Sequence, residues 1–419
     1  MDTSRSPRSS PLALLVGLVA VVAVLTWTVG WALPVVLAAI IVMVMGHEFG
    51  HFITAKRAGL LVTDFFVGFG PVVWSTTRGD TRYGVRALLL GGYVKVPGMS
   101  WAQPVEPALE SRTYRSAPYP RQVLFASAGS LMHVAMALIL AWASLTLFGL
   151  PSASHVGVLA FSQWDGHKEN AAQLAGLHLG DRVVAVNGQT ITSSTQLAAD
   201  VHHSAGRRLT LLVQRDGRDL TLHATPVDGR RLRVGGAPLA SGAAPEGFLG
   251  VEVGALTVRS SLFGAVPGAL SEVGSTIVTA LHGLVHVFTP GEFSNLFHQV
   301  ASPAAATSPS NQASRPVSIV GVVRIAVQGA QAGPGTLLYI LVSVNVFVGI
   351  FNMMPILPLD GGYVAIATYE RVRSRRGARY HADVNRLAPL IYAFVSVLLV
   401  LFATTLYLDI AHPIANPFG

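Results

Sequence analysis

The chain of 419 residues contains no cysteine and few charged residues. Without cysteine it has neither disulfide bonds nor thiolate metal ligands, so any zinc site must use histidine and carboxylate side chains. Asp, Glu, Lys and Arg together make up 12% of the residues, well below the usual share in soluble proteins, while 51% of the residues are hydrophobic. This composition predicts an integral membrane protein.

The charge that is present is mostly basic, with a net charge of +8. A basic chain can bind nucleic acid, but this sequence has no helix-turn-helix, zinc-finger or RNA-binding motif. Short loops rich in Lys and Arg lie on the cytoplasmic side of a membrane. The basic residues therefore indicate orientation in a lipid bilayer, and we expect no nucleic acid partner.

The apolar segment 32–54 carries His47-Glu48-Phe49-Gly50-His51. On a helix, His47 and His51 lie one turn apart on the same face, with Glu48 beside them. This is the H-E-x-x-H pattern of zinc proteases, in which two neutral imidazoles bind the metal and the carboxylate takes a proton from the attacking water. Ionisable side chains are expensive inside a membrane segment, which favours a functional role for all three.

A third candidate ligand follows a second apolar segment, residues 336–356. The chain there reads Pro355-Ile356-Leu357-Pro358-Leu359-Asp360. Two prolines three residues apart cannot continue a helix, so we expect the backbone to unwind at membrane depth, which is tolerated only against protein or water. Asp360 can then reach the metal held by His47 and His51; the alternative is that Asp360 caps a following helix.

His133 lies within the apolar segment 123–150 and has two interpretations. It is either a fourth metal contact or a packing residue whose ring is hydrogen-bonded in the core. A single histidine on an apolar helix is more often the second, which we favour.

The hydropathy and charge pattern predicts a polytopic α-helical membrane protein with an inserted β-rich domain and a membrane-associated β-hairpin. The expected segments are a cytoplasmic tail 1–10, an additional N-terminal span 11–29, a first half of the helical core 32–150 with spans 32–54 and 123–150 and a hairpin near 72–88, a β-rich domain 151–260, an amphipathic helix 261–300, a linker 301–315, and a second half of the core 316–419 with spans 336–356 and 387–408.

Two of these segments keep alternatives. Segment 11–29 is either a span or a removed signal peptide, although no small-x-small cleavage site is evident. The hairpin either dips toward the metal or packs on the cytoplasmic side, and periodicity does not separate the two. The loop 371–379 is rich in arginine, so the positive-inside pattern predicts that this loop and the tail are cytoplasmic, and that domain 151–260 and the C-terminus are outside.

Within domain 151–260, the run Ala175 to Gly188 reads A-G-L-x-x-G-D-x-V-x-x-V-N-G. This run resembles a PDZ domain, a module that takes an extended peptide onto a sheet edge. A peptide ligand is therefore expected here, and a generic small β domain is the alternative.

Five ordered motifs together resemble the site-2 protease family, zinc metalloproteases that cut transmembrane segments: His47 to His51, Gly68-Phe69-Gly70-Pro71, Gly91-Gly92-Tyr93-Val94-Lys95, Arg315-Pro316-Val317-Ser318-Ile319-Val320-Gly321, and Asn352 to Gly362. With a single PDZ domain, the chain is similar to bacterial members, and the position of Pro358 is similar to actinobacterial ones. Ala128-Gly129-Ser130-Leu131-Met132-His133 departs from the family's A-G-P-x-x-N.

The resemblance implies that His47, His51 and Asp360 bind Zn²⁺, that Glu48 is the catalytic base, and that Asn352 binds the substrate backbone. It also implies a multi-pass protein of the bacterial plasma membrane that takes part in regulated intramembrane proteolysis. Its substrate would be a single-span membrane protein, an anti-sigma factor. A membrane-anchored PDZ scaffold with a structural metal site is the alternative, and a metal transporter is a third possibility. A structural zinc site usually has four protein ligands, whereas this sequence offers three, which favours the enzyme.

Overall fold

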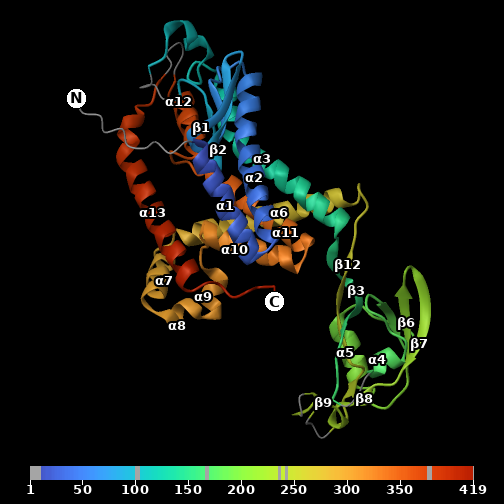
Figure 1. Ribbon diagram of the computed structural model, residues 1–419. Helices are drawn as coiled ribbons and strands as arrows, with labels where there is room; N and C mark the ends of the chain where they lie inside the picture. Colours follow the sequence, from blue (N-terminus) through green and yellow to red (C-terminus); the bar gives the residue numbers. More distant parts are fainter. Residues whose placement is uncertain are drawn as a thin grey trace. The chain divides into compact units, whose positions relative to one another are not determined.

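The computed structural model describes residues 11–99, 104–165, 169–234, 237–240, 244–374 and 380–418 (Figure 1). The predicted tail 1–10 and the last five residues of the predicted basic loop, 375–379, lie outside the described residues. The chain divides into two compact units. Unit 1 consists of Met1–Trp142 and Val266–Gly419, and unit 2 of Ala143–Ala265.

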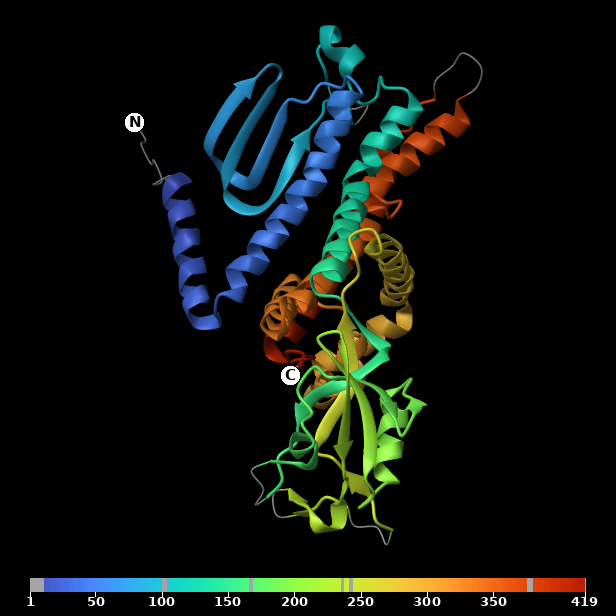
Figure 2. The same ribbon diagram turned by 90° about the vertical axis from the view of Figure 1, so that its right-hand side faces the viewer.

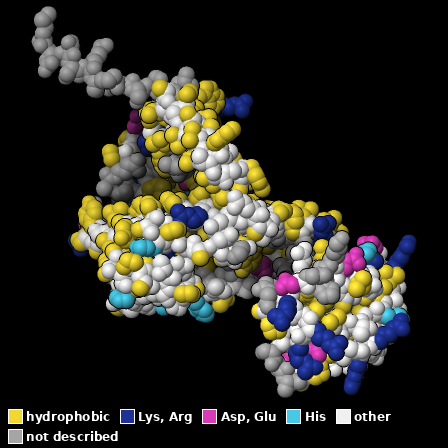
Figure 3. Space-filling model, turned by 60° about the horizontal axis from the view of Figure 1, so that its bottom comes forward, with side chains coloured by type: hydrophobic (Ala, Val, Ile, Leu, Met, Phe, Trp, Pro, Cys, Tyr) yellow, Lys and Arg dark blue, Asp and Glu magenta, His cyan; other side chains and the backbone are white. Residues whose placement is uncertain are grey.

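Unit 1 consists mainly of apolar helices. Among the described residues, four helices are long and apolar enough to cross a membrane: α2 (Ala32–Arg57), α3 (Tyr119–Leu147), α11 (Pro334–Asn352) and α13 (Ala388–Ala411). A further apolar helix, α1 (Pro11–Val29), joins α2 through a turn at Gly30, whose φ of +105° suits glycine. Hydrophobic side chains cover much of the visible face of unit 1, whereas charged side chains gather on unit 2 (Figure 3). The predicted fold class, a polytopic membrane protein with an inserted β-rich domain, is confirmed.

Helices α2 and α3 lie side by side (Figure 2), and two glycines of α2 permit their close approach. A side-chain carbon at Gly46 would collide with Met136, and one at Gly50 would collide with the carbonyl group of Ala128. Because Gly46 and Gly50 are four residues apart, they lie on one face of α2, as in the small-x-x-x-small pattern of packed membrane helices. The packing that joins α2 to α3 therefore involves the same helical turn that carries the two histidines.

A β-sheet follows α2 and is larger than the predicted hairpin at 72–88. Its strands are β1 (Asp64–Arg78) and β2 (Thr81–Lys95), which meet at a two-residue turn. Residues 64–67 pair not only with the start of β2 but also with residues 92–95 at its end. The sequence does not predict these outer arms, because their glycines interrupt the alternation that marks a strand.

The segment predicted as one amphipathic helix, 261–300, instead forms α6 (Ala265–Val287) and α7 (Pro290–Ala301), bent by 72°. The prediction of a single helix is wrong for a local reason. The side chain of Thr289 caps α7, and Pro290 has no N–H with which to continue the preceding helix.

The segment predicted as a linker, 301–315, is also helical, so that prediction is wrong. It contains α8 (Pro303–Thr307) and α9 (Pro309–Ser314). Proline is favoured at the first position of a helix because its ring fixes φ and no N–H is needed there. The prolines that suggested an irregular linker therefore start two short helices. Next come α10 (Ile319–Ala332) and, after α11, α12 (Asp360–Arg373).

A buried ion pair joins the start of α10 to the end of α13. Arg315 donates through Nη2 to Oδ1 of Asp409 at 3.0 Å, and both residues are buried. The other carboxylate oxygen accepts the backbone N–H of Ser318 at 2.7 Å. Gly321 leaves room for that carboxylate, since a side-chain carbon there would collide with it. The sequence Arg-Pro-Val-Ser-Ile-Val-Gly thus holds α10 against α13.

Unit 2 is built around a six-stranded sheet with the order β12-β3-β4-β6-β7, and β5 pairs with β4. These strands are β3 (Leu150–Phe161), β4 (Arg182–Val186), β5 (Gln189–Thr190), β6 (Leu209–Arg215), β7 (Arg218–Ala224) and β12 (Val251–Val258). Two helices, α4 (Ala171–Leu174) and α5 (Ser194–His202), contribute to its buried core of leucine, valine and alanine side chains. Four two-residue strands complete the unit: β8 (Val227–Asp228), β9 (Arg233–Val234), β10 (Ala237–Pro238) and β11 (Gly247–Phe248).

A buried carboxylate anchors the turn before β4 in unit 2. Asp181 receives two hydrogen bonds of 2.7 Å from Arg215 and one of 2.9 Å from the backbone N–H of His178. Burial acts to raise the pKa of Asp181, but the hydrogen bonds and charge of Arg215 outweigh burial, so the pKa is lowered.

Because the folded-state pKa of Asp181 is lowered, this ion pair stabilises unit 2 above the unfolded pKa of about 4, and the stabilisation is lost as the pH falls through the folded value. We expect Asp181→Asn to destabilise unit 2 at neutral pH by about 2–3 kcal/mol. This is less than the cost of breaking a fully buried ion pair, because Arg215 is partly exposed. Hydrogen exchange of the β4 and β6 amides in the full-length protein measures this. Amide protection in Asp181→Asn equal to that of the wild type at pH 7 would contradict the expectation. The control is Asp219→Asn, which alters an exposed aspartate.

Candidate metal centre

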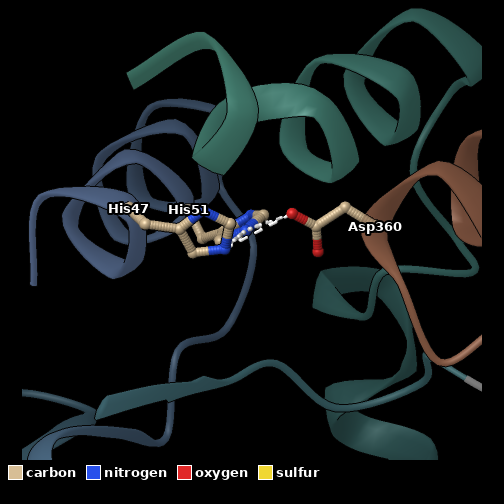
Figure 4. Close-up of side chains that lie close together, drawn as sticks. All are labelled: His47, His51 and Asp360. Atoms are coloured by element: carbon tan, nitrogen blue, oxygen red, sulfur yellow. Dashed lines mark hydrogen bonds and ion pairs between the residues drawn. The ribbon is translucent and has the colours of Figure 1, made fainter. Parts of the chain in front are cut away.

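Three side chains meet at one point in unit 1 (Figure 4): His47 and His51 from α2, and Asp360 from the start of α12. The Nε2 atoms of the two histidines lie 3.2 Å apart. Oδ2 of Asp360 lies 3.2 Å from Nε2 of His51 and 3.4 Å from Nε2 of His47. Residues separated by 309 positions in the sequence thus come together.

The backbone before α12 aims Asp360 at the histidines. Helix α11 ends at Asn352, and residues 353–359 are irregular before α12 begins at Asp360. Gly361 and Gly362 pack directly against the backbone of this irregular segment, where a side-chain carbon would collide with it. The two glycines therefore let α12 start close to the unwound chain. Asp360 is the first residue of α12, and its side chain faces the histidines.

The spacing of the three atoms fits a zinc ion. Two ligand atoms bound at about 2.0–2.1 Å with tetrahedral angles stand about 3.3–3.4 Å apart. The three distances here, 3.2, 3.2 and 3.4 Å, agree with that value. Two imidazoles and one carboxylate are also a usual ligand set of catalytic zinc, in which the fourth position is left for water or substrate. Among the described residues this is the one group with such convergence.

The backbone of α3 orients His51. Nδ1 of His51 lies 2.8 Å from the carbonyl oxygen of Phe125, so Nδ1–H donates and Nε2 keeps its lone pair for a metal. Gly129, one turn further along α3, faces both imidazoles; a side-chain carbon there would collide with His47 and with Nε2 of His51. The close contact of α3 with the histidines therefore depends on glycine at this position.

We expect Gly129→Ala to displace the imidazoles and to lower zinc affinity by roughly 10-fold or more, because the new methyl group needs the space that they occupy. The matched control is Gly274→Ala on α6, where a side-chain carbon meets open space. Zinc content after dialysis against a chelator measures the effect. Equal zinc retention by both variants would contradict this arrangement of α3.

Glu48 lies beside the metal group and against the sheet. It is half-buried on α2, and Gly92 of β2 packs against its side chain, with an added side-chain carbon standing 3.3 Å from Cγ. The carboxylate lies near the backbone of Val94 and interacts electrostatically with His51 and Asp360. The carboxylate is thus held next to the three convergent atoms by the end of β2.

The other two candidate residues lie near this centre without joining it. Asn352 is the last residue of α11 and is half-buried; within the described part of the chain its side chain has no hydrogen-bond partner. His133 is 1% exposed and is not one of the convergent ligands. Its Nδ1 lies 3.0 Å from Oδ1 of Asn345, and its ring centre is 5.1 Å from that of His47.

The sequence assigns no role at this centre to four groups that contact the candidate residues: the Phe125 carbonyl and Gly129 beside the histidines, Gly92 beside Glu48, and Asn345 beside His133. A carbonyl group carries no sequence signal, and Asn345 is 212 positions from His133. The glycine pair Gly46 and Gly50 was the available signal, because small residues four apart indicate a close helix contact at that turn.

Unit 2 contains an apolar cavity of about 570 Å³ between α5 and β12. Leu197 and Val201 of α5 and Val251 and Val253 of β12 are among the residues that line it. Strand β12 is at the edge of the six-stranded sheet. An edge strand beside an apolar cavity can accept an extended peptide, whose side chains enter the cavity.

The chain is similar to known proteases over most of its length. The family model of peptidase family M50 matches residues 35–398. Zinc metalloprotease Rip1 of Mycobacterium tuberculosis is 31% identical over 399 residues, covering 90% of this chain and 96% of that protein. Rip1 of Mycolicibacterium smegmatis is 29% identical over 411 residues, with the same two shares. A putative zinc metalloprotease of Nostoc is 27% identical over 343 residues, covering 81% of this chain and 86% of that protein.

Proposed function

Because the chain belongs to peptidase family M50, as its motifs indicated, we propose that His47, His51 and Asp360 bind zinc and that Glu48 is the catalytic base of peptide-bond hydrolysis within the membrane. The family, the named relatives and the apolar helices identify a membrane-embedded zinc metalloprotease, and the predicted enzyme class and cofactor are confirmed. One observation carries the residue assignment: three ligand atoms lie within 3.4 Å of each other at a spacing suited to tetrahedral zinc.

The roles of the protein side chains follow from their positions. When bound, zinc acts as a Lewis acid that polarises the scissile carbonyl and makes water a better nucleophile. Glu48, beside the ligands, accepts the water proton and later delivers it to the leaving amine. Asn352 lies at the end of α11, and its amide has no hydrogen-bond partner among the described residues, so it offers a donor and an acceptor to the substrate backbone.

A helical substrate must unwind before its peptide bond can be attacked, because its carbonyl groups are engaged within the helix. The end of β2 lies against Glu48, so an extended substrate segment beside the sheet would be close to the catalytic base. We therefore assign the sheet the role of holding unwound substrate, as expected for the predicted membrane-associated hairpin.

The substrate is a membrane protein, and we propose more narrowly a single-span anti-sigma factor in regulated intramembrane proteolysis. Unit 2 would act as an extracytoplasmic PDZ domain whose ligand is an extended peptide bound along β12. The cavity between α5 and β12 and the edge position of β12 support this assignment. The positive-inside rule places the arginine-rich loop 371–379 in the cytoplasm. This supports the placement of unit 2 outside a bacterial plasma membrane.

Co-expression with candidate single-span substrates tests the proposal. A shortened membrane fragment should accumulate with the wild-type chain and be absent with Glu48→Gln. For the substrate class, the panel should contain anti-sigma factors trimmed outside the membrane and unrelated single-span proteins. Cleavage of the unrelated proteins alone would exclude the anti-sigma assignment, and cleavage that persists with Glu48→Gln would exclude the assignment of the base.

A further inference from the structure

The two histidines of the metal group are oriented in different ways. His51 is fixed by the hydrogen bond of its Nδ1 to the Phe125 carbonyl group. Nδ1 of His47 is buried and lies against the backbone of Gly129, but within the described residues it forms no hydrogen bond of ordinary length and angle. Histidine ligands usually need a partner for the second ring nitrogen, which sets the orientation of the ring. The contact of His47 with the Gly129 backbone is therefore a weaker orienting partner than the hydrogen bond that His51 makes.

The ring of His47 is confined by two residues of α3. Gly129 lies against its Nδ1 and Cε1 atoms, where a side-chain carbon would collide. The ring of His133 lies 5.1 Å from the ring of His47, measured between centres, at an angle of 45°. Gly129 and His133 are four residues apart, so they lie on the same face of α3. Rotation of the His47 ring is thus restricted by a bare backbone and by a second imidazole.

His133 is itself held in place. Its Nδ1 donates to Oδ1 of Asn345, since Nδ2 of that amide already donates to the Leu341 carbonyl oxygen at 2.8 Å. His133 and Asn345 are 1% and 2% exposed. Gly349, one turn after Asn345 on α11, leaves space for the β-carbon of His133. The ring of His133 on α3 is therefore buried and held by α11. It presents a rigid surface to His47 of α2.

We propose that His133 and Asn345 are positioning residues that orient His47 for zinc, with the ring of His133 adding to the weak contact of His47 with the Gly129 backbone. This rests on the proposed function, in which His47 is a zinc ligand. It also gives a role to the histidine that stands where the family pattern A-G-P-x-x-N has asparagine. Helix α11 thereby contributes to the metal centre through the contact of Asn345 with His133 of α3. The segment that follows α11 leads to Asp360.

Zinc affinity measured by competition with a chelator in detergent-solubilised full-length protein tests the proposal without any need for substrate. Removing an outer partner of a metal ligand lowers affinity by roughly 10–100-fold. We expect His133→Ala and Asn345→Ala to fall in this range. The double variant His133→Phe/Asn345→Leu restores a ring and strands no buried polar atom, so it should recover most of the affinity. His282→Ala, on the exposed side of α6, is the control and should bind as the wild type does.

A second readout separates orientation from folding. Cobalt substituted for zinc reports ligand geometry through its visible absorption, which should change in His133→Ala and return in the double variant. Wild-type zinc affinity in both alanine variants would overturn the proposal. An equal loss of affinity in His133→Ala and in the double variant would also overturn it, because the phenylalanine ring should restore the contact with His47. If His133→Ala does not fold, Asn345→Ala decides. His47→Ala marks the baseline: wild-type zinc affinity in that variant would refute the metal site itself rather than the role of His133.

Discussion

Replacing Glu48 by glutamine should reduce cleavage of a transmembrane substrate by about 10²–10⁴-fold while zinc stays bound. Glutamine has nearly the same shape as glutamate but cannot accept the proton of the attacking water. Glu48 is not one of the three convergent ligand residues, so its loss leaves the metal group intact. The measurement is the rate of fragment formation from a purified substrate in detergent or nanodiscs, together with zinc content.

The matched control for Glu48→Gln is Glu272→Gln, which makes the same chemical change on the apolar helix α6, outside the metal group. It should cleave at the wild-type rate. Full activity of Glu48→Gln would show that another group is the base. Loss of zinc together with activity would instead make Glu48 part of the metal site.

Replacing Asp360 by asparagine should release zinc and abolish cleavage together. In the proposed site the carboxylate would supply one of the three ligands and the only negative charge among them, and a neutral amide is a much weaker ligand. We expect zinc affinity to fall by more than roughly 100-fold, because loss of a ligand should exceed the effect of losing an outer partner. Zinc content after gel filtration and competition with a chelator measure the change.

Asp383→Asn, which alters an exposed aspartate, is the control for this substitution and should leave zinc bound. The two predictions differ in form: Glu48→Gln separates zinc binding from catalysis, whereas Asp360→Asn removes both. A variant Asp360→Asn that keeps zinc but loses activity would place the carboxylate in catalysis rather than in the metal site.

The parts of the centre that the sequence predicts are those with a local signal. His47, Glu48 and His51 lie within one helical turn, so their spacing alone places them on a common face. Asp360 is distant in sequence, but the prolines before it indicate unwound backbone beside protein or water. The structure brings His47, His51 and Asp360 together, with Glu48 beside them.

What the sequence does not predict depends on tertiary contacts. The carbonyl of Phe125 and the space at Gly129 matter only because α3 approaches α2 closely. The larger sheet is formed by arms rich in glycine, where no alternation of side chains is present. In both cases the partner is elsewhere in the chain, and a pattern confined to one segment cannot identify it.

The errors at 261–315 have another cause. The apolar stripe of the predicted long helix is real, but periodicity does not detect the capping residue Thr289, which starts α7. The Ser- and Pro-rich stretch after it was interpreted by composition as a linker. Its prolines instead occupy the first positions of α8 and α9.

X-ray absorption at the zinc edge of the purified full-length protein shows whether His47, His51 and Asp360 bind one zinc ion together. We expect one zinc per chain, with two imidazole nitrogens at about 2.0–2.1 Å and carboxylate oxygen at about 2.0–2.2 Å. This spectrum should disappear in the triple variant His47→Asn/His51→Asn/Asp360→Asn. A full complement of zinc with an unchanged spectrum in that variant would show that these three residues do not bind the metal.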